Sequence, residues 1–210
     1  MPIGLTRRVR NHVNPFHVQY QTAAEPPHWE RIYAQLAQPF HLDIGTGCGR
    51  FLLAMAEQQP DWNFLGVEIR QPLVERANQW RQELHLTNLH FLAANINVSL
   101  RSLFAPQDLS LVTIQFPDPW FKKRHQKRRV VQPTLVADLA LLLRSGGSVF
   151  LQSDIAPVAE EMAERFSQHP AFINPNSHPL DHNPLGIPTQ RESQCVRLGL
   201  PIYRYWFDRL

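Results

Sequence analysis

The segment FHLDIGTGCG, residues 40–49, decides the fold. Its first half is a short run of mostly apolar residues that predicts a buried strand over 40–44. Gly45, Gly47 and Gly49 follow at alternate positions, and glycine lets a backbone turn sharply and approach a ligand closely. A helix over 51–57 is expected next. The segment therefore predicts a strand–loop–helix unit, in which the glycines serve either a ligand or only a tight turn.

Strands and helices alternate along the rest of the chain. After a helix around Trp29–Leu36, further strands are expected at 64–67, 89–93, 109–115, 148–152 and 203–207, and further helices at 72–84, 98–104, 130–143 and 155–166. Five prolines between 170 and 188 argue against regular structure there. Alternation of this kind predicts an α/β fold with a mostly parallel sheet and helices on both faces. Ligands of such sheets bind at the carboxyl ends of the strands.

Length and composition are those of one globular domain. The 210 residues suit a single core, and we expect a loosely held N-terminal arm over 1–27 and one domain over 28–210. The chain shows neither an apolar run of about 20 residues nor a secretory signal. Two cysteines, Cys48 and Cys195, make neither a disulfide framework nor a zinc site, so a cytoplasmic protein without a metal is expected.

Two polar residues follow neighbouring strands. Glu68 stands nineteen residues after Gly49, where an acid can accept hydrogen bonds from both hydroxyls of an adenosine ribose. The spacing G-x-G-x-G differs from the G-x-G-x-x-G of dinucleotide sites, and a cationic cofactor would tolerate the nearby Asp43. S-adenosyl-L-methionine is therefore favoured over NAD. Asn95 could reach an adenine amine, or it could cap the following helix.

The segment FPDPW, residues 116–120, follows the strand at 109–115. Two prolines stiffen the backbone around Asp118, so this acid would point from a fixed scaffold, beside an aromatic ring that could stack on a base. Residues 122–129 then carry six positive charges, in a chain whose net charge is only +3. Such a basic run is typical of a phosphate-backbone partner, although a solvated loop would look the same.

The segment FPDPWFKKRHQKRRVVQP, residues 116–133, closely resembles the signature of the bacterial tRNA (guanine-N7-)-methyltransferases. Asp43-Ile44-Gly45, Gly66-Val67-Glu68 and Ser153-Asp154 are similar to other blocks of that family, in the same order. The resemblance covers roughly residues 40–207. It implies the class I methyltransferase fold, which is Rossmann-like and doubly wound with a mostly parallel seven-stranded sheet.

The resemblance also implies the activity, which is transfer of a methyl group from S-adenosyl-L-methionine to N7 of a guanine in the variable loop of tRNA. It assigns site residues in three groups, with Asp118 also as the catalytic residue: Asp43, Gly45, Gly47, Glu68, Asn95 and Asp118 for the cofactor; Lys122, Asp154, Thr189 and Glu192 for the substrate; Arg124, Lys127, Arg128 and Arg129 for RNA. The chain departs from the family at Asn95, where Asp is usual, and at Gln190-Arg191, where Lys and an aromatic residue are usual.

Two alternatives remain open from the sequence. Because the PDPW segment resembles the Asp/Asn-Pro-Pro-aromatic loops of enzymes that methylate exocyclic base amines, another base atom could be the target. The chain could also be an RNA-binding module without catalytic activity. Failure to bind the cofactor would favour the second alternative, and identification of the methylated atom would decide the first.

Overall fold

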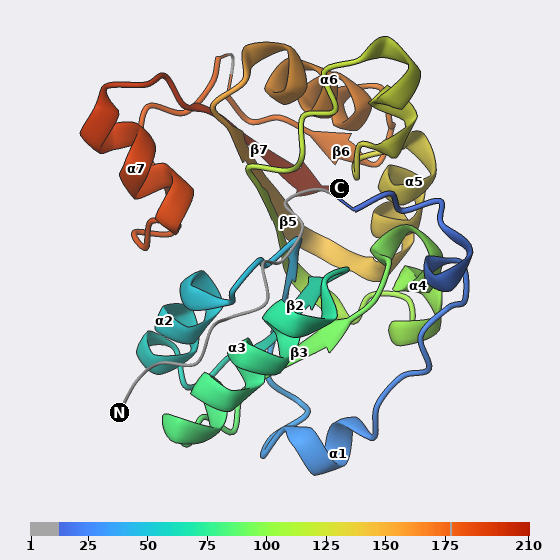
Figure 1. Ribbon diagram of the computed structural model, residues 1–210, viewed down its shortest axis with the longest axis vertical. Coiled ribbons are helices and arrows are strands. Elements are labelled where there is room, and N and C mark those ends of the chain that lie inside the picture. The colour runs from blue at the N-terminus through green and yellow to red at the C-terminus, as the bar shows by residue number, and fades with distance from the viewer. Residues whose placement is uncertain (1–12, 177) are drawn as a thin grey trace.

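The computed structural model describes residues 13–176 and 178–210, and these form a three-layer α/β structure (Figure 1). The expected arm over 1–27 falls partly outside this range, since its residues 1–12 are not described. The strands are β1 Phe40–Ile44, β2 Asn63–Glu68, β3 Leu89–Ala93, β4 Leu109–Gln115, β5 Leu143–Ser153, β6 Phe172–Ile173 and β7 Tyr203–Arg209. The α-helices are α1 Trp29–Ile32, α2 Arg50–Gln58, α3 Gln71–Glu83, α4 Ile96–Leu103, α5 Pro133–Leu142, α6 Ala156–Ser167 and α7 Gln190–Leu198.

The sheet has seven strands in the order β3-β2-β1-β4-β5-β7-β6, which confirms the predicted fold class. β1 to β5 are parallel, and the last two strands pair antiparallel, β7 with β5 and β6 with β7. The strand order reverses direction between β1 and β4. The loops after these two strands therefore lie side by side at the carboxyl edge, where such sheets bind their ligands.

Two apolar cores hold the layers together. One lies between the sheet and α4, α5 and α6, and contains Leu139, Leu151 and Phe166. The other lies under α2 and α3 and contains Leu52, Ala77 and Phe91. Phe91 also touches the glycine loop, because a Cβ on Gly49 would stand 2.6 Å from its ring. Gly49 is therefore required for packing as well as for its left-handed backbone.

Several elements differ from the expected pattern. α1 ends at Ile32 rather than near Leu36, and α4 begins at Ile96 rather than at residue 98. α5 begins at Pro133 rather than at residue 130, and β5 begins at Leu143, with the expected Gly146-Gly147 turn forming an irregularity within it. β6 and α7 were not expected at all. α7 has a capped N-terminus, but it follows the proline-rich stretch and carries only a few apolar residues, so its periodicity is weak.

Candidate active site

A cavity opens at the point where the strand order reverses. Gly45 after β1, Glu68 at the end of β2, Asn95 after β3 and Asp118 after β4 all line it. Four of the six residues expected at the cofactor site therefore face one space. The other two stand directly behind it: Asp43 precedes the lining residue Ile44, and the backbone N–H of Gly47 donates to Glu68.

The glycine loop leaves room in front of its backbone. Gly45 and Gly47 have φ of 81° and 59°, values that strain residues with a side chain. A Cβ at either position would meet nothing within 4 Å. These two glycines are thus needed for backbone conformation, and the space beside them is free for a ligand.

Asp43 is a buried acid, with 4% of its surface exposed. The Thr113 hydroxyl donates to Asp43 Oδ1 at 2.6 Å, and the Gln115 amide donates to the same oxygen at 3.4 Å. Burial raises the pKa of Asp43 to about 6, although the hydrogen bond from Thr113 lowers it. A cation placed near this carboxylate would favour its charged form.

Glu68 already accepts several hydrogen bonds from its neighbours. It accepts hydrogen bonds from the N–H groups of Gly47 and Arg70, both at 3.1 Å, and from the guanidinium of Arg70 at 3.0 Å. Arg70 also lines the cavity and interacts electrostatically with Asp118. Sequence reasoning missed Arg70, although its position two residues after Glu68 at a strand end could have indicated it.

Asn95 caps the helix that follows it, as one interpretation of the sequence predicted, and it also lines the cavity, where its contact with an adenine stays a prediction. Its Oδ1 accepts a hydrogen bond from Asn97 N–H and caps α4, which begins at Ile96 rather than at residue 98. Its Nδ2 donates to the carbonyl oxygens of Pro15 and Tyr20, and Pro15 lines the cavity as well. An aspartate here could not donate to these carbonyls. The departure from the family pattern therefore ties the described part of the N-terminal segment to the cavity.

The PDPW loop holds Asp118 under backbone strain. Phe116 and Trp120, on either side of it, have positive φ values of 49° and 43°, which residues with side chains seldom adopt. Arg129 holds the loop from behind: its Nε donates to the Pro119 carbonyl at 2.8 Å, and its guanidinium pairs with Glu161 on α6. Arg129 is only 9% exposed. That Arg129 contacts RNA stays a prediction; in this structure its charge is buried and paired with Glu161.

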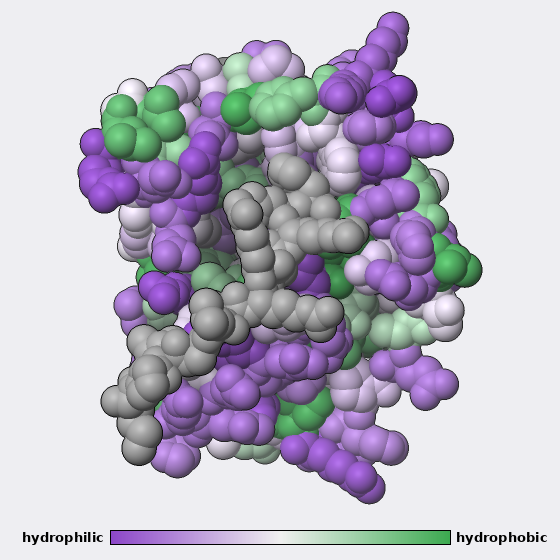
Figure 2. Space-filling view, in the orientation of Figure 1, coloured by the Kyte–Doolittle hydropathy of each residue, from purple (hydrophilic) through white to green (hydrophobic). Residues whose placement is uncertain are grey.

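The rest of the basic run reaches solvent. Residues 123–128 form a short 3₁₀-helix, η2, and Figure 2 shows hydrophilic side chains gathered over this part of the surface. Lys122, Arg124 and Lys127 are exposed, whereas the Arg128 guanidinium lies 5.1 Å from the ring centroid of Trp120 and lines the cavity. Arg128 thus belongs to the cavity wall, and its exposed neighbours form the outer rim.

The expected substrate residues fall into two environments. Asp154, one residue after β5, forms an ion pair with Arg191 on α7. Thr189 caps the N-terminus of α7 by accepting from the N–H of Glu192. Asp154 and Thr189 both lie at the carboxyl edge of the sheet, beyond the end of β5, but neither lines the cavity as Asp118 does.

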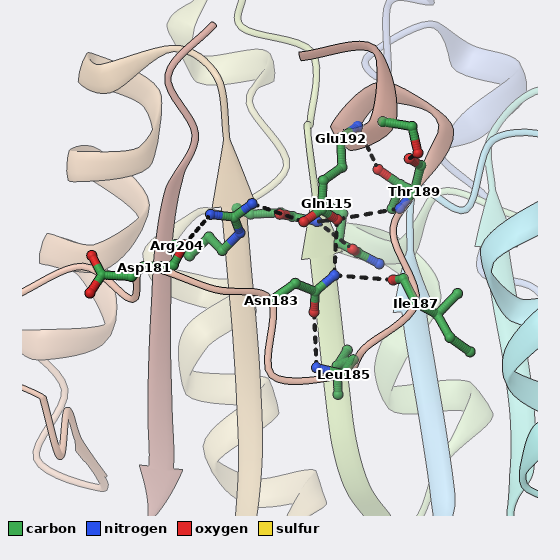
Figure 3. A network of polar contacts seen from close by, with 10 residues as sticks. Gln115, Asp181, Asn183, Leu185, Ile187, Thr189, Glu192 and Arg204 are labelled. Atoms are coloured by element: carbon green, nitrogen blue, oxygen red, sulfur yellow. Dashed lines mark hydrogen bonds and ion pairs between the residues drawn. The ribbon is translucent and has the colours of Figure 1, made fainter. Parts of the chain in front are cut away.

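Glu192 is enclosed by protein donors (Figure 3). Its Oε1 accepts from Arg204 at 2.9 Å, and its Oε2 accepts from Gln152 at 3.1 Å and from Asn183 at 2.9 Å. Only 3% of the residue is exposed. That Glu192 binds the substrate stays a prediction, and a guanine would have to displace partners that this carboxylate already has.

Two further observations concern metal sites and membrane spans among the described residues, 13–176 and 178–210. Within them, side chains of His, Cys, Asp and Glu do not gather in groups of three that could hold a metal ion. The helices in this range are also too short or too polar to cross a membrane.

Comparison with known proteins assigns the chain. Residues 37–205 match the family model described as "Putative methyltransferase". The curated tRNA (guanine-N(7)-)-methyltransferases of Synechococcus sp. strain JA-3-3Ab and of Synechocystis sp. strain PCC 6803 are 72% and 51% identical to this chain. The alignments cover 98% and 96% of this chain, and 87% and 97% of the relatives.

A solved structure supports the fold independently. The antibiotic-resistance methyltransferase Kmr superposes with a TM-score of 0.54 at 17% identity, covering 86% of this chain and 91% of its own. At this identity the likeness concerns the fold alone. The two curated relatives, by contrast, match over nearly the whole length, and identities of 72% and 51% show common descent. The chain belongs to the tRNA (guanine-N(7)-)-methyltransferase family.

Proposed function

We propose that this protein transfers the methyl group of S-adenosyl-L-methionine to N7 of a guanine in tRNA, within the cytoplasm. The observation that carries the proposal is the single cavity onto which the glycine loop, Glu68 and Asp118 converge, with the exposed basic rim beside it. The curated relatives of this chain are named for the same activity. The variable-loop guanine is the target we propose.

The residues around the cavity fit this cofactor. The open space beside Gly45 and Gly47 would receive its amino-acid end, close to Asp43. Glu68, at the end of β2, would accept from the ribose hydroxyls, and Arg70 would then give up part of its hold on that carboxylate. Ala94 and Ile96 offer apolar contact to an adenine, with the Asn95 amide between them in sequence.

The chain's own residues have little proton chemistry to perform, since neutral guanine has a free lone pair at N7. The bound cofactor supplies an electrophilic methyl group, whose bond to sulfur breaks as its bond to N7 forms, so that positive charge passes to the base. Asp118 would stabilise that charge and orient the base, from a loop fixed by Arg129. Lys122 and Asp154 are proposed to contact the target nucleotide, and Thr189 to position α7 beside it.

The activity itself can be tested directly. An unmodified tRNA transcript incubated with the protein and S-adenosyl-L-methionine should acquire N7-methylguanine at one position, which borohydride and aniline cleavage would locate. A transcript with adenosine at that position is the matched control and should stay uncleaved. Methylation of an exocyclic amine, found by mass spectrometry, would overturn the proposed target atom.

The substitution Glu68→Ala should weaken cofactor binding on the order of 100-fold, because two ribose hydroxyls lose a charged acceptor. Calorimetry on the folded variant measures the effect. Glu57→Ala removes an exposed acid at the end of α2 and should leave affinity unchanged. Equal affinities of Glu68→Ala and the parent would refute the ribose assignment.

The basic rim is proposed to bind tRNA phosphates. Lys123, the first residue of η2, is exposed like Arg124 and Lys127. Replacing these three residues together by alanine should weaken tRNA binding and lower the slope of log affinity against log salt by about one unit per lost contact. Arg128 and Arg129 are left in place, because they belong to the cavity wall and to the support of the PDPW loop.

Filter binding across a salt series tests this prediction. Arg144→Ala is the control, since Arg144 is an exposed cation within β5, near its amino end and away from the carboxyl edge. Cofactor affinity should not change in the triple variant. If its salt slope equals that of the parent, the rim does not bind RNA.

A further inference from the structure

A line of three buried polar side chains runs behind the cavity, across β1 and β4. His41 and Thr113 have no exposed surface and Asp43 has 4%. His41 Nε2 lies 3.0 Å from the Thr113 hydroxyl, which lies 2.6 Å from Asp43 Oδ1. Asp43 and Thr113 are also paired neighbours in the sheet register. Buried polar groups are costly, so such an arrangement calls for a reason beyond packing.

The hydrogen bonds in this line have a definite direction. An ionised Asp43 can only accept, so the single hydroxyl proton of Thr113 goes to it. The Thr113 oxygen must then accept from His41, which fixes the proton of the imidazole on Nε2. His41 Nδ1 has no hydrogen-bond partner among the described residues, which fits an unprotonated nitrogen better than a buried N–H. Burial also lowers the pKa of His41 to about 3, so the ring is a neutral donor.

Apart from the hydrogen bonds that it accepts, the surroundings of Asp43 disfavour its charge. Burial raises its pKa most, and the Glu68 carboxylate on the neighbouring β2 raises it further. Among the groups that lower this pKa, Thr113 has the largest effect, followed by the side chain of Thr46 in the glycine loop. Gln115 on β4 contributes only a 3.4 Å hydrogen bond from an uncharged amide, and His41 on β1 is itself neutral. The Thr113 hydroxyl is therefore the principal support of the carboxylate.

We propose that Thr113 and His41 are positioning residues for Asp43, which hold its carboxylate oriented and ionised to receive the cationic end of the cofactor. The proposal rests on the proposed function for the identity of that cation. The proposal predicts in which direction cofactor affinity changes with pH. Because the cofactor favours ionised Asp43, affinity is constant at high pH and is lost as the pH falls through the pKa of this carboxyl, about 6 in the parent. Removing the Thr113 hydroxyl moves the loss to higher pH.

The test measures the affinity for S-adenosyl-L-methionine by calorimetry at pH values on both sides of 6. Thr113→Val should shift the midpoint of the pH profile upward by about one unit, so that binding weakens about twofold at pH 7 and about tenfold at pH 5. Thr113→Ser keeps the hydroxyl and should restore the parent profile. His41→Leu should shift the midpoint in the same direction but by less. Thr113 can then still donate its hydroxyl proton to Asp43, but the His41 N–H that orients this hydroxyl is lost.

A merely structural role would give a different result. It would lower the free energy of unfolding and reduce affinity equally at every pH, with the midpoint unmoved, and that outcome overturns the proposal. If Thr113→Val does not fold, the comparison of parent, Thr113→Ser and His41→Leu still decides.

A second readout does not depend on the cofactor. Carbon-13 NMR of the Asp43 carboxyl in the protein alone should show a titration near pH 6 in the parent and at higher pH in His41→Leu. Failure of the parent to bind S-adenosyl-L-methionine would refute the proposed function but leave this titration meaningful. An unchanged titration in His41→Leu would refute the positioning role even if the enzyme is active.

Discussion

Asp118→Ala is expected to lower the rate of methyl transfer by roughly 10²–10³-fold while the protein stays folded. Asp118 lines the cavity at its exposed side and is the acid nearest in sequence to the basic rim. The contact of Arg129 with Pro119 and the two prolines also hold its loop, so removal of the carboxylate should leave the scaffold intact. The loss should fall on the transition state, in which charge reaches the guanine ring.

Single-turnover rates with saturating tRNA and cofactor are the appropriate measurement, because they separate chemistry from binding. Asp118→Asn keeps the shape without the charge and should be nearly as slow. Asp61→Ala removes an exposed acid before β2, at the other edge of the sheet, and should react at the parent rate. Near-normal turnover of Asp118→Ala would transfer the catalytic role to Asp154.

Much of the fold could be predicted from the sequence, because its signals are local. The apolar runs of β1 to β4 are short and bounded by loop residues, and each was expected close to its observed range. β6 has two residues within a proline-rich stretch and is formed by pairing with β7, which no local pattern reveals. α7 carries charged and polar residues on most positions, and its stability depends on its cap and on partners far away in the sequence.

The part of the site that lies at the ends of parallel strands could be predicted, because those ends meet at one edge of the sheet. Acids and amides at strand ends were expected to converge, and Glu68, Asn95 and Asp118 do line one cavity. What a side chain already binds was not predictable. Arg129 looks like its basic neighbours in sequence, but the partner that buries its charge, Glu161, lies on α6 and is 32 residues away.

Glu192 is a second residue whose partners the sequence does not reveal, and its removal is expected to have a large effect on stability. Its carboxylate and the Arg204 guanidinium form an ion pair at 2.9 Å, with side chains 4% and 9% exposed. Removing one member of a buried pair leaves the other charge without compensation, at a cost of about 3–5 kcal/mol. Glu192→Ala would also remove the acceptor of Gln152 and Asn183 and half of the α7 capping box.

Glu192→Ala is therefore expected to lower the free energy of unfolding by about 3–5 kcal/mol, whereas loss of a guanine contact alone would leave stability unchanged. Urea denaturation measures it, and Glu164→Ala, at an exposed position of α6, should change stability by less than about 0.5 kcal/mol. The double variant Glu192→Leu with Arg204→Leu should lose less stability than the two single substitutions summed, because neither charge is then left unpaired.

If Glu192→Ala unfolds like the parent but loses tRNA methylation, the carboxylate does bind the substrate, and the ion pair between Glu192 and Arg204 must open when tRNA is bound. If stability falls and the double variant recovers part of it, Glu192 acts by fixing the start of α7 beside Asp154, and recognition of the base belongs to Asp118, Lys122 and Asp154.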